Sequence, residues 1–160
     1  MLSNNSFIYN IIHLIGKTIG AGFGSGLSPV MPGTAGSLLA IIIYIASPIE
    51  RDSLWAIAII LLGIVLGILA CNTVVTESDK DPKKAVWDEF IGMWITCLFL
   101  PKETLWLIAA FICFRALDIT KPYPGRKLEG LHGGIGIMAD DILVGIYWAI
   151  ILNIIRIALS

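Results

Sequence analysis

A strongly apolar stretch without any charged residue, from Ser53 to Cys71, is the feature that most restricts the fold of the chain. As an α-helix rising about 1.5 Å per residue it would be about 28 Å long, close to the roughly 30 Å of hydrocarbon in a bilayer. A second stretch, from Ile142 to Leu159, would reach about 27 Å and carries only Arg156, near its end. We therefore expect both stretches to cross a membrane.

The composition supports this interpretation. Of the 160 residues, 57% are hydrophobic and 14% are charged, which is more apolar side chain than the core of one soluble domain of this size needs. A formal net charge of −1 gives no basic field for nucleic acid, and we predict no nucleic-acid or protein partner. We expect residues 1–160 to form a single domain, solvated partly by lipid.

Three shorter apolar runs, Ala35–Ser47, Phe90–Leu100 and Thr104–Leu117, could be short spans, tilted helices or buried bundle helices. Near the N-terminus, apolar residues between Phe7 and Ile19 recur at helical spacing, as in a helix that lies at an interface or docks on a bundle. The expected fold class is all-α: a compact helical membrane protein with about four to five apolar helices plus an N-terminal amphipathic helix.

If all five runs cross, residues 1–34, 72–89 and 118–141 share one face of the membrane. Seven of the 11 lysines and arginines lie in these segments and Arg115 lies just before the last of them, so the positive-inside rule makes that side cytoplasmic. Three polar segments would converge there, which is the geometry of a site.

Two adjacent acid pairs, Asp88-Glu89 and Asp140-Asp141, each stand at the edge of an apolar segment. An acid costs about 2.5 to 3.5 kcal/mol or more inside a bilayer, so four of them require a reason. Mg²⁺ prefers oxygen ligands and is held by carboxylates together with substrate phosphate, so all four are candidate metal ligands. Helical neighbours point about 100° apart, so we expect one acid of each pair to face the site. The simpler alternative is that Asp88 and Asp140 only cap the helices that follow.

A glycine-rich segment, Gly20–Ser37, is a candidate phosphate-binding loop. Glycines permit positive φ angles and close approach of the backbone, so N–H groups around Gly24, Ser25 and Gly26 could form an anion nest. Thr34 or Ser37 could cap the following helix, whose N-terminus favours phosphate. Alternatively, the glycines only allow close helix packing.

Charges of both signs stand at the end of the apolar run Thr104–Leu117. Arg115 and Asp118 are three residues apart and can pair on one helical face, while Lys121 adds a cation that could meet an anionic headgroup. A purely structural salt bridge is the alternative. His132, in a glycine-rich segment before the second acid pair, is either structural or a proton-transfer group.

Several segments together resemble the phosphatidylglycerophosphatase A family. They are Gly22–Pro29, Pro32–Ser37, Val86–Thr96, Phe114-Arg115 with Asp118 and Lys121-Pro122, and His132–Asp141, in this order. The resemblance implies an all-α, magnesium-dependent phosphatase of the bacterial inner membrane that converts phosphatidylglycerophosphate to phosphatidylglycerol. Gly125 and the linker to His132 depart from the family pattern.

The residues then receive the following expected roles. Asp88, Asp141 and His132 are candidate catalytic residues for direct attack by metal-activated water on the phosphorus. Arg115 and Lys121, with the glycine-rich segment, would bind the substrate phosphate, and Asp118 would orient Arg115. An aspartate nucleophile stays open. The alternative function is a membrane cation transporter or channel, which predicts acids spread through the depth of the membrane.

Overall fold

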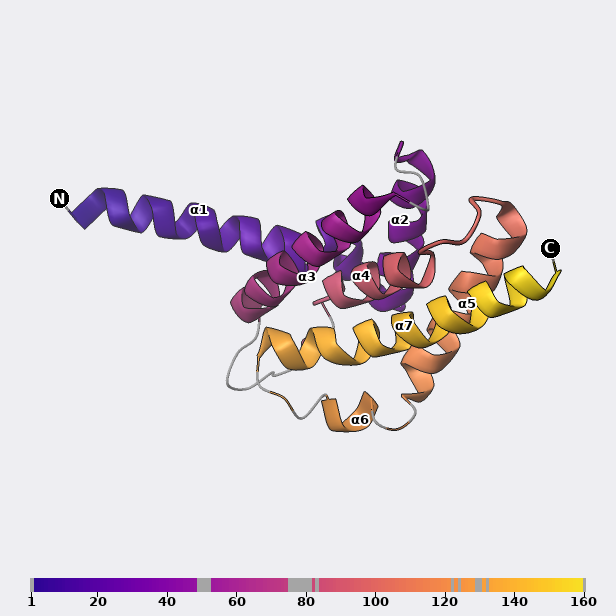
Figure 1. The fold of residues 1–160 in the computed structure, drawn as a ribbon. Coiled ribbons are helices and arrows are strands. Elements are labelled where there is room, and N and C mark those ends of the chain that lie inside the picture. Colours follow the sequence, from indigo (N-terminus) through magenta and orange to yellow (C-terminus); the bar gives the residue numbers. More distant parts are fainter. Residues whose placement is uncertain are drawn as a thin grey trace.

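The computed structural model describes residues 2–48, 53–74, 82, 84–121, 123, 125–128, 131 and 133–159. These residues form helices and no strand (Figure 1), so the expected all-α class is confirmed. The elements are α1 (Leu2–Gly20), a 3₁₀ helix (Gly22–Leu27), α2 (Pro32–Ala46), α3 (Leu54–Val74), α4 (Trp87–Thr96), α5 (Thr104–Thr120), α6 (Gly125–Leu128) and α7 (Gly134–Leu159).

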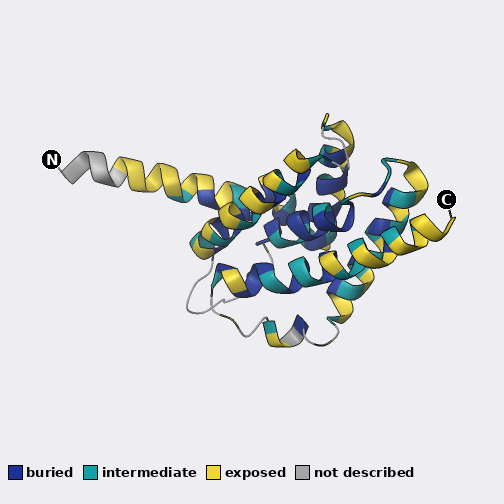
Figure 2. Cartoon of the chain, in the orientation of Figure 1, coloured by how far each residue is buried: buried dark blue, intermediate teal, exposed yellow. Residues whose placement is uncertain are grey.

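The short helix α4 lies at the centre of the bundle. Helices α2, α3, α5 and α7 all pack against it, α7 most extensively. Phe90, Ile91 and Met93 on α4 are almost completely buried, and the helix is largely dark blue in Figure 2. Because other helices surround α4, side chains that point in different directions from it still face the protein interior.

Two glycines allow the backbones of α4 and α7 to touch. A Cβ atom added to Gly145 would lie 2.6 Å from the carbonyl oxygen of Gly92 and 3.0 Å from Cβ of Ile95. Small residues at such contacts let membrane helices approach closely. Asp88 lies four residues before Gly92, and Asp141 lies four residues before Gly145. The glycine contact therefore places the two acid pairs beside each other, one turn away.

Two helices, α3 and α7, are long and apolar enough to cross a membrane. Only 33% of the most apolar window of α3 and 17% of that of α7 is buried inside the protein, so most of their apolar side chains face outward. Helix α2 is apolar but shorter. The expectation of four to five apolar helices is therefore not confirmed, although helices occur where all five apolar runs were expected.

The N-terminal helix α1 is present as expected, and its two halves differ. Its C-terminal end packs closely on α3, where Gly16 meets Thr73 and Gly20 meets Val74. Its N-terminal half projects away from the bundle (Figure 1), with Phe7 and Ile12 exposed. Contact of this helix with a membrane surface stays a prediction.

The alternative that Asp88 and Asp140 only cap their helices is wrong. Helix α4 begins at Trp87 with Val86 as its N-cap, so Asp88 lies within the first turn. Helix α7 begins at Gly134, so Asp140 lies inside the helix and caps nothing. The side chain of Asn72, at the end of α3, accepts a hydrogen bond of 2.7 Å from the Gly134 N–H. This hydrogen bond, from a residue distant in sequence, satisfies an N–H group at the start of α7. The helix can therefore begin before the apolar run Ile142–Leu159.

We predict that Gly145→Ala destabilises the protein by about 1 to 3 kcal/mol, because the added methyl group overpacks the contact between α4 and α7. The measurement is denaturant unfolding in detergent micelles. The matched control is Gly125→Ala, because nothing lies within 4 Å of a Cβ atom added at Gly125. Equal stability of the two variants would contradict the close backbone contact.

Candidate active site

Three carboxylates from two helices meet inside one end of the bundle. Asp88 and Glu89 come from the first turn of α4, and Asp141 comes from α7. One oxygen of each lies within 4.8 Å of those of the other two. Each residue also has a buried oxygen with no hydrogen-bond partner in the described part of the chain: Asp88 Oδ1, Glu89 Oε2 and Asp141 Oδ2. We call these three residues the carboxylate cluster.

Burial changes the acidity of the two α4 acids. It raises the pKa of Asp88 well above its usual range, and the nearby carboxylates of Glu89 and Asp141 raise it further. Burial also raises the pKa of Glu89, while the Arg115 guanidinium opposes that rise. The cluster therefore holds negative charge at a cost unless a cation shares the site.

Arg115 on α5 brings positive charge to the carboxylate cluster. Its Nη1 atom forms an ion pair with Asp118, which confirms the pairing expected from their spacing, and lies 3.9 Å from Glu89 Oε1. The same atom lies 3.5 Å from the Ser37 hydroxyl oxygen. The Arg115 Nε atom is buried without a partner among the described residues. Asp118 and Glu89 thus fix the guanidinium while part of its donor capacity stays unused.

The first turn of α2 forms another wall of the site. A Cβ atom added to Gly33 would collide with Glu89 Oε1 and would lie 3.2 Å from Arg115 Nη1. The Thr34 hydroxyl is buried without a partner in the described structure, and the Ser37 hydroxyl donates to the Gly33 carbonyl at 3.0 Å. Thr34 and Ser37 lie inside α2, whose N-cap is Met31, so neither caps it as expected.

Sequence reasoning missed Gly33 as a contact of the site. The only signal was its place in the Pro32-Gly-Thr segment at a helix start, and this signal could not distinguish it from the other glycines of the same region.

Asp140 has a different environment from Asp141. Its Oδ2 accepts a hydrogen bond of 2.7 Å from Lys121 Nζ, in a partly buried ion pair. Lys121 ends α5 in the left-handed conformation, with φ of 44°. Three of the four predicted metal ligands thus form the carboxylate cluster. The fourth, Asp140, pairs with Lys121, which was predicted to bind the substrate phosphate.

The groups of the predicted nest make hydrogen bonds within their own turn. The N–H groups of Gly24 and Gly26 donate to the Ala21 carbonyl at 2.9 and 3.1 Å, and the Ser25 hydroxyl donates to the Gly22 carbonyl. Phosphate binding by this segment stays a prediction. His132 lies outside the described residues.

The donor set fits a hard divalent cation. Mg²⁺ takes oxygen ligands, and Asp88, Glu89 and Asp141 each offer a carboxylate oxygen within 4.8 Å of those of the other two, close enough to share one ion. Arg115 beside them is suited to an anionic group with several oxygens, such as phosphate. The arrangement can therefore hold a metal and a phosphate side by side.

Comparisons with known proteins identify phosphatases among the relatives of this chain. The family model described as Phosphatidylglycerophosphatase A matches residues 18–156. Two proteins named phosphatidylglycerophosphatase A are similar: that of Escherichia coli is 44% identical, with 84% of this chain and 79% of the relative covered, and that of Haemophilus influenzae is 38% identical, with 90% and 88% covered.

A third relative, from Bacteroides thetaiotaomicron, is 43% identical, with 86% of this chain and 91% of the relative covered, and its name proposes a phosphatidylinositol-3-phosphatase. No solved structure matches the chain. On the extent of these matches, the chain belongs to the phosphatidylglycerophosphatase A family of phosphoric monoester hydrolases.

Proposed function

We propose that this enzyme hydrolyses phosphatidylglycerophosphate to phosphatidylglycerol and inorganic phosphate, that it requires Mg²⁺, and that it acts at the cytoplasmic face of the bacterial inner membrane. The observation that carries the proposal is the carboxylate cluster, with its three unpartnered oxygens beside Arg115, in a chain of this family. Burying three acids together without a cation would be costly, so the cluster fits a metal that a phosphate substrate shares.

Asp88, Glu89 and Asp141 are the residues that would hold Mg²⁺, which supplies charge to screen the phosphate and to increase the acidity of water. Arg115 binds a nonbridging phosphate oxygen and stabilises charge that develops there. Asp118 positions Arg115 through their ion pair. Lys121 contributes positive charge beside the phosphate while Asp140 holds its ammonium group.

The proposed reaction is direct displacement at phosphorus. A water oxygen forms a bond to phosphorus as the bond to the glycerol oxygen breaks; the leaving oxygen gains a proton and the attacking water gives up one, so the products are the alcohol and hydrogen phosphate. His132 is the proposed proton donor. A covalent aspartyl-phosphate route would instead leave a stoichiometric, trappable phosphate on the protein.

Two features support a membrane location with the site on the cytoplasmic side. Helices α3 and α7 are apolar, long enough to span, and mostly outward-facing. Seven of the chain's 11 lysines and arginines lie in the segments expected on the same side as the acid pairs, and Arg115 lies at the adjoining end of its apolar run. The substrate headgroup would meet the site from that surface.

The arrangement of the acids disfavours a cation channel. A conduction pathway needs ion-binding groups at successive depths. Here the four acids of the two pairs, together with Asp118, gather around one end of α4. A compact cluster of this kind suits catalysis at one surface.

We predict that Asp88→Asn and Asp141→Asn each lower the rate of phosphate release from phosphatidylglycerophosphate by about a hundredfold or more, as when one preorganised electrostatic contact to a transition state is removed. The measurement is inorganic phosphate released by purified protein in mixed micelles with MgCl₂. Phosphatidylinositol 3-phosphate, assayed in parallel, tests the activity that the name of the Bacteroides relative proposes.

The matched control for these two variants is Glu103→Gln. Glu103 is an exposed acid before α5, and its side chain makes no cap hydrogen bond. It should keep wild-type activity. Full activity of both aspartate variants, or no phosphate release by the wild type, would refute the proposal.

We also predict that Mg²⁺ raises the melting temperature more at about pH 8 than at about pH 5, because metal and protons compete for the same oxygens. The raised pKa values of Asp88 and Glu89 mean that the folded protein binds more protons than the unfolded chain. Without metal, stability therefore falls as pH rises from the ordinary carboxyl range toward these raised pKa values. Mg²⁺ should restore stability in that window.

Thermal unfolding with MgCl₂ and with EDTA at both pH values measures this effect. In Asp88→Asn the difference between the two pH values should shrink, while Glu103→Gln should behave as the wild type does. A Mg²⁺ shift of equal size at both pH values would contradict the assignment of these acids as ligands.

A further inference from the structure

Most of the buried polar atoms that lack a partner belong to the walls of the candidate active site. The described part of the chain has six buried side-chain nitrogen or oxygen atoms without a hydrogen-bond partner. One is the indole nitrogen of Trp148, and the other five belong to the carboxylate cluster, to Arg115 and to Thr34. A buried polar group without a partner lowers stability, so several of them in one place indicate a site for a ligand.

These five atoms are of two chemical kinds. The three carboxylate oxygens accept hydrogen bonds or bind cations, and the proposed Mg²⁺ accounts for them. The Arg115 Nε–H group can only donate, and the Thr34 hydroxyl can donate as well. A cation cannot accept hydrogen bonds from these two donors. They therefore require an acceptor of their own, which an anionic oxygen would supply.

The position of Thr34 in α2 explains why its hydroxyl has no partner within the helix. Hydroxyl groups inside helices can donate to the carbonyl four residues earlier, as Ser37 does to Gly33 at 3.0 Å. Thr34 is the third residue of α2, so the residue four positions earlier, Val30, lies before the helix begins. The Thr34 hydroxyl is thus left to interact with a group outside its own helix.

The contacts of Arg115 leave its Nε–H group for such an acceptor. Asp118 forms its ion pair with Nη1, and Glu89 Oε1 and the Ser37 hydroxyl lie 3.9 and 3.5 Å from the same atom. None of these contacts uses Nε, which is buried. Arginine binds phosphate through several N–H groups of its planar guanidinium, so an Nε–H group without a partner suits a phosphate oxygen.

The neighbours of Thr34 bring it close to Arg115. Thr34 follows Gly33 directly, and a Cβ atom added to Gly33 would lie 3.2 Å from Arg115 Nη1. Ser37 lies three residues after Thr34, on the same face of α2, and its hydroxyl approaches the same nitrogen. The two donors, one from α2 and one from α5, therefore lie on the same side of the site.

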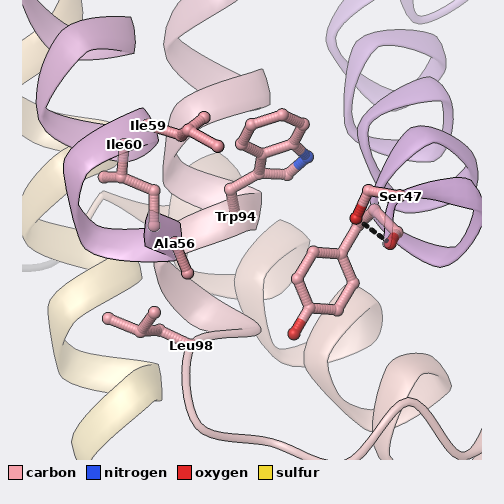
Figure 3. Close-up of a pocket in the computed structure, with 7 residues that line it drawn as sticks. Ser47, Ala56, Ile59, Ile60, Trp94 and Leu98 are labelled. Atoms are coloured by element: carbon pink, nitrogen blue, oxygen red, sulfur yellow. Dashed lines mark hydrogen bonds between the residues drawn. The ribbon is translucent and has the colours of Figure 1, made fainter. Parts of the chain in front are cut away.

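Polar groups at the other end of α2 are satisfied within the protein. There, beside a small apolar hollow, the Ser47 hydroxyl donates to the Tyr44 carbonyl at 2.8 Å (Figure 3). The Lys102 ammonium donates to the Ser47 carbonyl at 2.7 Å. Because the bundle satisfies polar groups at this end, the unsatisfied hydroxyl of Thr34 at the other end indicates a ligand and not loose packing.

We propose that the Thr34 hydroxyl binds the substrate by donating a hydrogen bond to a nonbridging oxygen of the terminal phosphate, beside the Nε–H group of Arg115. The proposal rests on the proposed lipid phosphatase activity, which uses Arg115 and not Thr34. It makes Thr34 a phosphate-binding residue whose hydroxyl lowers the stability of the protein without substrate.

The first test is the activity of Thr34→Val, which keeps the shape of the side chain and removes the hydroxyl. We expect kcat/KM for phosphatidylglycerophosphate to fall by about tenfold or more, the scale of one hydrogen bond to a charged group. Thr34→Ser should keep most of the wild-type value. The control is Thr18→Val, because Thr18 is exposed on α1 and its hydroxyl donates to the Leu14 carbonyl at 2.9 Å.

Thermal unfolding distinguishes a binding role from a structural one. Without phosphate, Thr34→Val should melt at or above the wild-type temperature, because a methyl group replaces a buried hydroxyl that has no partner. With MgCl₂ present, inorganic phosphate should raise the melting temperature of the wild type and of Thr34→Ser more than that of Thr34→Val. A Thr34→Val protein that melts well below the wild type without phosphate would overturn the proposal.

The two proposals fail in different ways. If the wild type releases no phosphate from phosphatidylglycerophosphate, the proposed function is wrong. If the wild type is active while Thr34→Val keeps its kcat/KM, or is stabilised equally by phosphate, the assignment of Thr34 alone is wrong. Failure of both Thr34→Val and Thr34→Ala to fold would also refute this assignment, because a hydroxyl without a protein partner is not needed for folding.

Discussion

Asp88, Glu89 and Asp141 each place one carboxyl oxygen within 4.8 Å of those of the other two, and the repulsion between these largely enclosed acids is the constraint that their surroundings must offset. The described structure offsets it with Arg115, which contacts Glu89, and with the N-terminus of α4, whose dipole favours acids in its first turn. Several oxygens still lack a partner. The carboxylate cluster thus lowers the stability of the folded protein, compared with apolar residues at the same positions. A bound cation would restore that stability.

Helix packing converts acids that are distant in sequence into this cluster. The backbone contact at Gly92 and Gly145 leaves no room for side chains between α4 and α7, so the acids one turn earlier must meet. Gly33 does the same for α2, because any side chain there would displace Glu89 and Arg115. The glycines therefore determine the distances in the site, and the charged residues determine its chemistry.

Local patterns predicted the helices and most members of the site, while contacts between distant segments caused the errors. Arg115 and Asp118 pair because their spacing is local. The early start of α7 depends on Asn72, which is 62 residues from Gly134. The periodicity of apolar residues could not predict a contact between residues so far apart. The expectation that only one acid of each pair faces the site suits Asp141 but not Asp88 and Glu89. Because α4 is surrounded by helices, both of its acids point inward.

The short length of α4 has its own cost, because its C-terminal carbonyl groups end in the interior of the bundle. There the Tyr44 hydroxyl donates to the Cys97 carbonyl, and the Asn153 amide donates to the Leu98 carbonyl at 2.9 Å. In lipid, water could not replace these donors, so irregular backbone must be satisfied by protein. With that requirement met by α2 and α7, α4 can end inside the bundle. A short central helix thus presents acids in its first turn and keeps its last carbonyl groups hydrogen-bonded within the protein.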